Sequence, residues 1–208
     1  MSQPRLPPPA PTCLCRRYSS SQKGGTLIVE DVDGFEAHAR RLCDPDGYRP
    51  QQCPGCFWFR LHVHDYRDRT LRAEAERASV RVVRHLCPNC GAVWLILPLF
   101  IARLLRRTWR VVEACVLGPG PSNNAPTVPK RTARRWAERL RAAASLPVQV
   151  LAQSANEALV AVATAVGLDA TREQLVLAYA AAFGIPAGER LAALAALLHR
   201  LAPRVRLM

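Results

Sequence analysis

The sequence has little that would place the protein in a membrane or in the secretory pathway. Its only long apolar run, Ala92 to Ala102, has eleven residues and is interrupted by Pro98, which is too short for a helix that spans a bilayer. The first residues, Met1 to Leu6, are followed by prolines and contain no apolar stretch of the kind that a signal peptide needs. We therefore expect a cytoplasmic protein with no membrane partner.

The sequence also lacks the recognisable marks of an enzyme. It contains no nucleophile-and-base pair, no phosphate-binding loop and no nucleotide-binding fingerprint. Acidic residues are few, with 16 against 29 lysines and arginines and a net charge of +13. Nearly all of the positive charge is arginine, whose planar guanidinium binds two phosphate oxygens at once. We expect a non-enzymatic protein that binds a polyanion, most simply DNA; the alternative is a basic protein from an arginine-rich genome.

Cysteine is abundant, and four of the eight cysteines form two CxxC pairs. The pairs are Cys53-Pro54-Gly55-Cys56 and Cys87-Pro88-Asn89-Cys90, with thirty residues between them. Two such pairs complete the tetrahedral shell of one Zn²⁺ at about 2.3 Å per Zn–S bond, and Pro or Gly inside each pair favours the tight turn. We predict a structural zinc ion held by Cys53, Cys56, Cys87 and Cys90. Two disulfides or four inert thiols are the alternatives, although disulfides are rare in a reducing cytoplasm.

Other potential ligands lie near these cysteines, namely His62, His64 and His85. Because four cysteines already fill the shell, we interpret the histidines as exposed strand residues, close enough to arginines to contact phosphate. We expect Cys43 to be a small buried hydrophobic residue. Cys13 and Cys15 lie in a Pro- and Ser-rich leader, residues 1–25, which we expect to be disordered, and Cys115 has no assigned role.

The first half of the chain has the patterns of a small zinc ribbon. Helical periodicity places Phe35, Ala39 and Leu42 on one stripe of a helix over 34–43. Residues 57–66 alternate as a strand does, with one face made by Phe57, Phe59, Leu61 and Val63 and the other by Trp58, Arg60, His62, His64 and Tyr66. We predict strands over 26–30, 57–66, 80–86 and 93–97, with a polar hairpin loop over 68–78.

Two basic helices follow, over 99–117 and 130–145, joined by a proline-rich linker over 118–129. Their apolar stripes are Leu105, Trp109, Val112 and Val116 in the first, and Thr132, Trp136 and Leu140 in the second. Residues 103–141 hold ten basic and two acidic residues. We expect DNA contacts from Arg103, Arg106, Arg107, Lys130, Arg131, Arg134 and Arg135; a merely solvated charged face is the alternative.

Residues 146–208 form a tail rich in alanine and leucine, which we expect to fold as an independent helical unit. One helix stripe runs through Leu151, Ala155, Leu159, Val162 and Val166. Thr171 and Gln174 form a capping box for a second helix that ends at Gly184. A third helix opens at Pro186 and carries Leu191, Leu194, Leu198 and Leu201. This leucine face is either buried in the tail or used for self-association.

Several motifs in residues 27–117 carry a family resemblance: Leu27-Ile28-Val29, Tyr48-Arg49-Pro50 before the first CxxC, His64 to Arg69, Val80-Arg81-Val82 before the second, and Leu97-Pro98. In these motifs the chain resembles a family of uncharacterised bacterial zinc-ribbon domains related to the zinc-finger and helix-turn-helix leader of insertion-sequence transposases. The resemblance implies an arginine-rich helix after the ribbon, and then a helix-turn-helix that ends in a motif similar to Arg131–Trp136.

The chain departs from this pattern at 118–129, where a helix-turn-helix has its positioning helix and a short turn. Either the helix over 99–117 packs from across the linker, or the motif is degenerate. A transposase catalytic domain needs three carboxylates on a mixed sheet, and only Glu157, Asp169, Glu173 and Glu189 follow Glu138.

The sequence therefore predicts an α+β protein: a zinc ribbon with a basic helix over 26–117, a basic helix and a helical tail. We expect a DNA-binding protein similar to a transposase leader, from a mobile element, without the catalytic domain. Two alternatives remain. The helical tail makes it a protein-interaction adaptor, or the protein is a DNA-binding accessory subunit of a separately encoded transposase.

Overall fold

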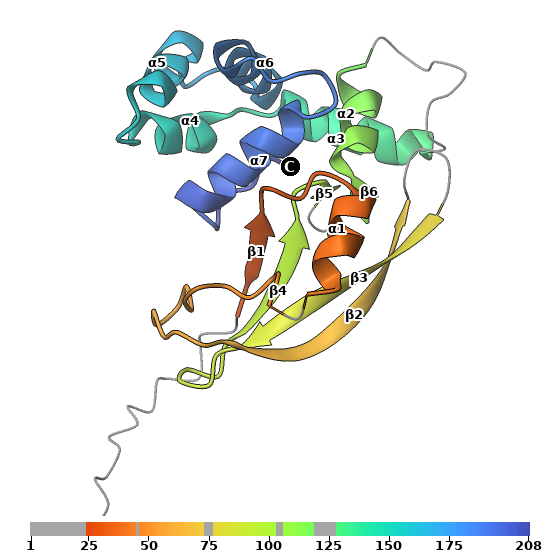
Figure 1. Cartoon of the computed structure of the whole chain (residues 1–208). Helices are drawn as coiled ribbons and strands as arrows, with labels where there is room; N and C mark the ends of the chain where they lie inside the picture. The colour runs from red at the N-terminus through yellow and green to blue at the C-terminus, as the bar shows by residue number, and fades with distance from the viewer. Residues whose placement is uncertain (1–23, 45, 73–76, 103–105, 119–127) are drawn as a thin grey trace, which may run out of the picture.

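The computed structural model describes residues 24–44, 46–72, 77–102, 106–118 and 128–208. Within these ranges the protein is mixed α+β, with a curled six-stranded sheet and seven helices, as Figure 1 shows. The predicted leader lies outside them except for Gly24 and Gly25, and so do Cys13, Cys15 and residues 119–127 of the predicted linker.

The sheet is built around one long antiparallel hairpin. Its strands are β1 (Thr26–Val29), β2 (His62–Arg72), β3 (Arg77–Leu86), β4 (Val93–Pro98), β5 (Ile101–Ala102) and β6 (Arg107–Thr108), in the order β1-β4-β3-β2-β6-β5. β2 pairs with β3 along their whole length, and β4 adds to β3 in antiparallel. β1 runs parallel to β4, so the predicted strands over 26–30, 80–86 and 93–97 are confirmed.

The prediction for the hairpin was wrong in two places. The strand expected over 57–66 begins only at His62, because Phe57 and Arg60 have left-handed backbones that no pleated strand contains. The polar residues assigned to a loop over 68–78 instead continue both strands, leaving only four residues between Arg72 and Arg77. Those side chains face solvent, where cross-strand partners such as Asp68 and Arg81 form an ion pair.

The helix predicted over 99–117 is also corrected. Its first part forms the short strands β5 and β6, and α2 covers only Trp109–Val116. The helix begins at Trp109 because Thr108 is its N-cap, with the side chain accepting a hydrogen bond from the Val111 backbone N–H at 3.4 Å. Trp109 and Val112 are buried as expected, whereas Leu105 lies outside the described residues.

Helix α1 (Phe35–Leu42) packs on the sheet through the buried His38, and the predicted stripe is confirmed in part, because Leu42 packs on the core and the Phe35 ring lies 4.9 Å from the Phe100 ring. Ala39 is exposed, and His38 is 4% exposed. His38 Nε2 lies 2.7 Å from the Arg81 carbonyl, so this nitrogen carries the proton, and Nδ1 accepts from the Tyr48 hydroxyl at 2.5 Å. Cys43, just after α1, is exposed and was wrongly predicted to be buried; its thiol donates to the Ala39 carbonyl.

The stability of this contact should depend on pH. Burial lowers the pKa of His38, so the unfolded chain takes up a proton at a higher pH than the folded protein does. The His38 contribution is therefore present above the unfolded pKa of about 6.5 and is lost as the pH falls below it. Between about pH 7 and pH 5, thermal unfolding should show a steeper loss of stability for the wild type than for His38→Gln. Equal slopes would contradict this, since both proteins keep the same cysteines.

The remaining helices gather at one end of the sheet (Figure 1). They are α3 (Lys130–Arg141), α4 (Ser145–Ala152), α5 (Glu157–Val166), α6 (Arg172–Phe183) and α7 (Arg190–Leu201). Trp109 of α2 and Trp136 of α3 lie in the same buried cluster as Leu151, Leu175 and Leu194 of these later helices. The core of the helical part is therefore built from both basic helices and the tail.

Two details of the predicted tail change. The single stripe from Leu151 to Val166 is broken at Gln153–Asn156, because Asn156 caps α5 by accepting from the Ala158 backbone N–H at 3.0 Å. The capping box of Thr171 and Gln174 and the stop at Gly184 are confirmed.

The leucine face of α7 packs inside the chain. Leu191, Leu194 and Leu198 are 0% exposed, and the predicted opening at Pro186 is replaced by a start at Arg190. These three leucines contact the chain's own core, whereas Leu201, the fourth residue of the predicted face, is 40% exposed.

Polar contacts join helices of the helical part to one another and join α7 to the sheet. Glu113 of α2 is 4% exposed, and its carboxylate accepts hydrogen bonds from the backbone N–H groups of Gly188 (2.6 Å) and Leu191 (3.0 Å) at the start of α7. His199 contacts the Thr26 carbonyl of β1 at 2.7 Å. Over the described ranges, no helix has the length and apolar character needed to cross a bilayer.

Candidate metal centre

The two CxxC pairs lie in tight turns at the same end of the hairpin. The first turn precedes β2 and the second follows β3, so the pairing of these strands brings the turns together. Backbone hydrogen bonds of 2.8–2.9 Å close each turn in the same pattern: Phe57 to Cys53 and Cys53 to Trp58 in the first, Gly91 to Cys87 and Cys87 to Ala92 in the second. Each turn directs its two thiols to the same side.

The four sulfurs have the spacing of a metal shell rather than of disulfides. Cys53 Sγ lies 3.7 Å from Cys90 Sγ, Cys56 Sγ lies 3.5 Å from Cys87 Sγ, and all four sulfurs are within 4.8 Å of one another. A tetrahedron with Zn–S bonds of about 2.3 Å has S–S edges of about 3.8 Å, whereas a disulfide bond is about 2.05 Å. None of the six cysteines in the described residues forms a disulfide. The cluster can therefore hold a metal ion.

The sulfurs are surrounded partly by apolar side chains and partly by polar groups. Cys53 and Cys87 are 0% exposed and pack with Leu61, which is also 0% exposed. Asn89, inside the second turn, donates from Nδ2 to Cys56 Sγ at 3.5 Å. Burial raises the pKa of the Cys56 thiol, but the Asn89 amide and neighbouring hydrogen bonds outweigh it and leave the pKa at about 7. Asn89 was not singled out from the sequence, although a polar residue inside a CxxC turn is a recognisable signal.

Burial raises the pKa of Cys90 to about 12, and it also raises the pKa of Cys87. Since metal ligation requires thiolates, binding an ion here must displace protons, and affinity should rise with pH.

The nearby histidines do not join the cluster. His62 and His64 are exposed on β2, as predicted. His85 is 0% exposed, so its assignment as an exposed residue was wrong; it lies on β3 opposite Trp94 of β4, and neither ring nitrogen has a hydrogen-bond partner. Burial lowers the pKa of His85, which keeps the ring neutral. Among the described residues, the grouping that could hold a metal contains cysteines alone.

The predicted DNA-contacting residues fall into two groups. Arg103 lies outside the described residues, Arg106 is exposed with a left-handed backbone, and Arg107 is only 6% exposed. Burial lowers the pKa of Arg107, and a side chain so covered does not present its guanidinium to a phosphate. The other four are exposed on one helix, α3: Lys130, Arg131, Arg134 and Arg135.

Helix α3 presents these cations because its other face is anchored. Trp136 is 5% exposed and Leu140 is 1% exposed, and both pack in the helical core, while Thr132 is half-buried. This confirms the predicted stripe. Helix α2 contacts α3, so the helix before the linker does pack against the helix after it.

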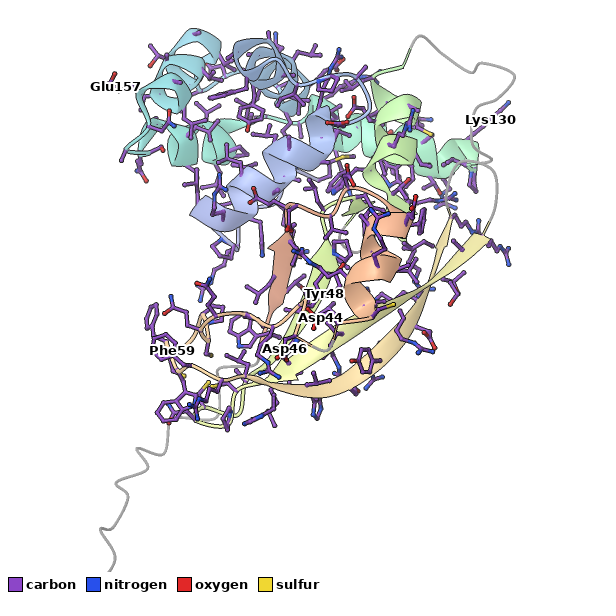
Figure 2. All side chains as sticks on the ribbon, viewed as in Figure 1. Asp44, Asp46, Tyr48, Phe59, Lys130 and Glu157 are labelled. Carbon is purple, nitrogen blue, oxygen red and sulfur yellow. The ribbon has the colours of Figure 1, made fainter. Side chains whose placement is uncertain are left out.

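The structure also exposes three aromatic residues that the sequence assigned to a strand. Phe57, Trp58 and Phe59 are 66%, 49% and 65% exposed. They follow Cys56 directly, and the signal that was missed is that the residues after a CxxC pair still belong to its turn. In Figure 2, Phe59 lies at one end of the molecule and Lys130 of α3 at the other. The cysteine cluster and the basic helix are therefore separate surfaces.

Comparison of the chain with curated proteins and with solved structures gave no match. Residues 53–136 match a family described as a domain of unknown function, DUF6431. The match begins at the first cysteine of the cluster and ends at Trp136, so it covers the cluster, the hairpin, α2 and the four predicted DNA-contacting cations of α3, but not Arg139 and Arg141. A DUF6431 domain of unknown function thus spans residues 53–136 of this chain.

Proposed function

We propose that this protein binds DNA through the exposed basic face of α3, and that a zinc ion in the cysteine cluster holds the hairpin ends together. The choice of zinc rests on the donor set, because four thiolates in a tetrahedral arrangement favour zinc or iron–sulfur iron, and a structural zinc site is closed by four protein ligands.

The charge of α3 is the observation that carries the DNA proposal. The helix holds six cationic residues and one acidic residue, and no acidic residue lies in its first turn. Lys130 and Arg131 instead occupy that turn, where the helix dipole disfavours a cation by about 0.3–1 kcal/mol. A helix selected only for stability would carry the opposite charge there. Bound phosphates would remove this repulsion and also interact favourably with the dipole.

The ion pairs support this interpretation. Among these cations, Arg134 pairs with Glu138 at 2.9 Å, and this pair is largely exposed, at 83% and 54% of the two side chains. Such a pair contributes little to stability, so a phosphate can replace Glu138 at small cost.

Binding should be tested by fluorescence anisotropy of a labelled duplex at several salt concentrations. If four cations contact phosphates, the logarithm of affinity should fall against the logarithm of salt with a slope near ~−3.6. Arg134→Gln/Arg135→Gln should weaken binding to every sequence and reduce the size of the slope by about two. A loss confined to one preferred sequence would mean that these arginines read bases instead.

The matched control is Arg204→Gln/Arg206→Gln, which removes the same charge from two exposed arginines outside α3. If both double variants weaken binding equally, net charge rather than α3 is responsible. If neither does, the DNA proposal fails.

The resemblance to transposase leaders extends the proposal to a DNA-binding accessory subunit of a separately encoded transposase, or to a remnant of a mobile element. Co-purification of a catalytic partner would support the former. The adaptor alternative is weakened by the burial of Leu191, Leu194 and Leu198, since the helical tail no longer offers that face to a partner.

A further inference from the structure

We propose that the aromatic tip, defined as Phe57, Trp58 and Phe59 at the first cysteine turn, stacks on unpaired bases of single-stranded nucleic acid. This inference deepens the DNA proposal and rests on it, but it concerns a different surface from α3. The reasons come from a comparison of the two cysteine turns within the same chain.

The second cysteine turn has the same backbone geometry as the first, so its residues indicate which residue types this turn requires for folding alone. The matching hydrogen bonds make Phe57 the counterpart of Gly91, and Trp58 the counterpart of Ala92. Both Phe57 (φ 59°) and Gly91 (φ 71°) are left-handed. Glycine adopts this conformation freely, whereas a bulky residue is strained in it. The first turn therefore keeps a residue that its own geometry disfavours.

Burial does not explain the aromatic residues either. Ala92 is 2% exposed, whereas Trp58 is 49% exposed and Phe57 is 66% exposed. Leu61, four residues after Phe57, is the side chain of this segment that packs on the cysteines. In the described part of the chain, the close aromatic ring pairs all involve other residues. The three rings thus offer their faces to a partner.

The charge around the tip favours nucleic acid over other partners. Residues 47–64, between Asp46 and Asp65, contain no acidic residue and include Arg60, His62 and His64, whereas Arg49 is ion-paired with Asp46 at 2.5 Å. Arg60 follows the three rings directly, is exposed and is itself left-handed at φ 64°. Aromatic rings beside arginine in an acid-free segment are the elements with which proteins hold single strands, because every base has a face that can stack. In a duplex these faces are covered, so the tip should prefer unpaired bases.

Stacking and phosphate contact can be separated by their salt dependence. Stacked bases release no counterions, so base stacking does not contribute to the salt dependence of affinity. Replacing a tip ring should therefore lower affinity for a single strand without changing the salt slope. Replacing Arg134 and Arg135 should change the slope.

The test is a titration of full-length, metal-loaded protein with thymidine-rich single-stranded DNA, with the uridine-rich RNA counterpart and with a duplex. Trp58→Ala should bind the single strands about 5- to 150-fold more weakly, at unchanged salt slope and with duplex binding retained. The RNA and DNA arms show which strand is preferred. Trp58→Phe is the conservative control. It should keep most of the affinity, but it should lose the tryptophan fluorescence quenching that a base stacked on Trp58 would cause.

Phe57→Gly provides the second variant, because it copies the second turn. It should keep its metal and its melting temperature, since the strained residue is removed, yet bind single strands more weakly. A purely structural role for Phe57 predicts the reverse, namely lower stability with affinity unchanged. If Trp58→Ala and Phe57→Gly both bind single strands as tightly as the wild type, the inference is overturned, and a protein partner becomes the explanation for the exposed rings. If duplex binding is lost only in the Arg134→Gln/Arg135→Gln variant, that result concerns the proposed function of α3 and not the aromatic tip.

Discussion

The Cys87→Ser/Cys90→Ser variant is expected to bind no metal, whereas the wild type should bind one zinc ion per chain. The four sulfurs lie within 4.8 Å of one another, and two ligands cannot hold a structural ion. Structural zinc sites release about 10–16 kcal/mol on binding, which is comparable to the whole stability of a typical domain, about 5–15 kcal/mol. The ends of β2 and β3, which the cluster joins, should therefore lose their order.

Elemental analysis measures the metal, and hydrogen exchange measures the order of the hairpin ends. The helical core around Trp136 is a separate buried cluster from the one that contains Cys53 and Cys87. The far-ultraviolet signal of the helices should therefore persist in the variant. Cys43→Ser is the matched control, because Cys43 is exposed and lies outside the cluster. Full zinc retention in the double variant, or far less than one zinc in the wild type, would refute the proposal.

Trp136→Ala is expected to lower the free energy of unfolding by about 3–5 kcal/mol, the usual cost of deleting a buried large aromatic side chain. Trp136 is 5% exposed and lies in the same cluster as residues of α2 and of α4–α7. The loss should therefore affect the C-terminal helices as well as α3. Below the new melting temperature, the folded fraction should still bind duplex DNA, because the cations on the opposite face remain.

Urea denaturation followed by circular dichroism measures this loss. Arg135→Ala, at the neighbouring exposed position, is the control and should change stability by no more than about 0.5 kcal/mol. If Trp136→Ala leaves the unfolding of the C-terminal helices unchanged, the prediction that residues 146–208 fold as an independent unit would be supported instead.

The success of the sequence predictions depended on how local each signal was. The cysteine turns were found because two ligands three residues apart are already positioned by one tight turn. The face of α3 was found because Trp136 and Leu140 repeat at helical spacing while the arginines fill the other positions. The capping box at Thr171 is similarly contained within four residues.

The errors came where a local pattern competed with tertiary geometry. Residues 57–66 alternate as a strand does, but the left-handed backbones of Phe57 and Arg60 keep the first five of them out of the strand, which begins at His62. Residues 99–117 repeat as a helix does, but Thr108 caps the helix and the preceding residues pair as β5 and β6. Periodicity reports which face a regular element buries, and it does not report where that element begins.

The sequence by itself determined the four-cysteine cluster that could hold a metal ion, the mixed α+β class and the basic face of α3, because each rests on short local patterns. The tertiary structure alone decided that Glu113 would cap α7, that His38 would be buried against Tyr48, and that the leucines of α7 would pack within the chain. It also exposed the aromatic tip. The physical reason is that burial and hydrogen bonding between segments as far apart as Glu113 and Gly188 depend on how the chain returns on itself, which no local pattern encodes.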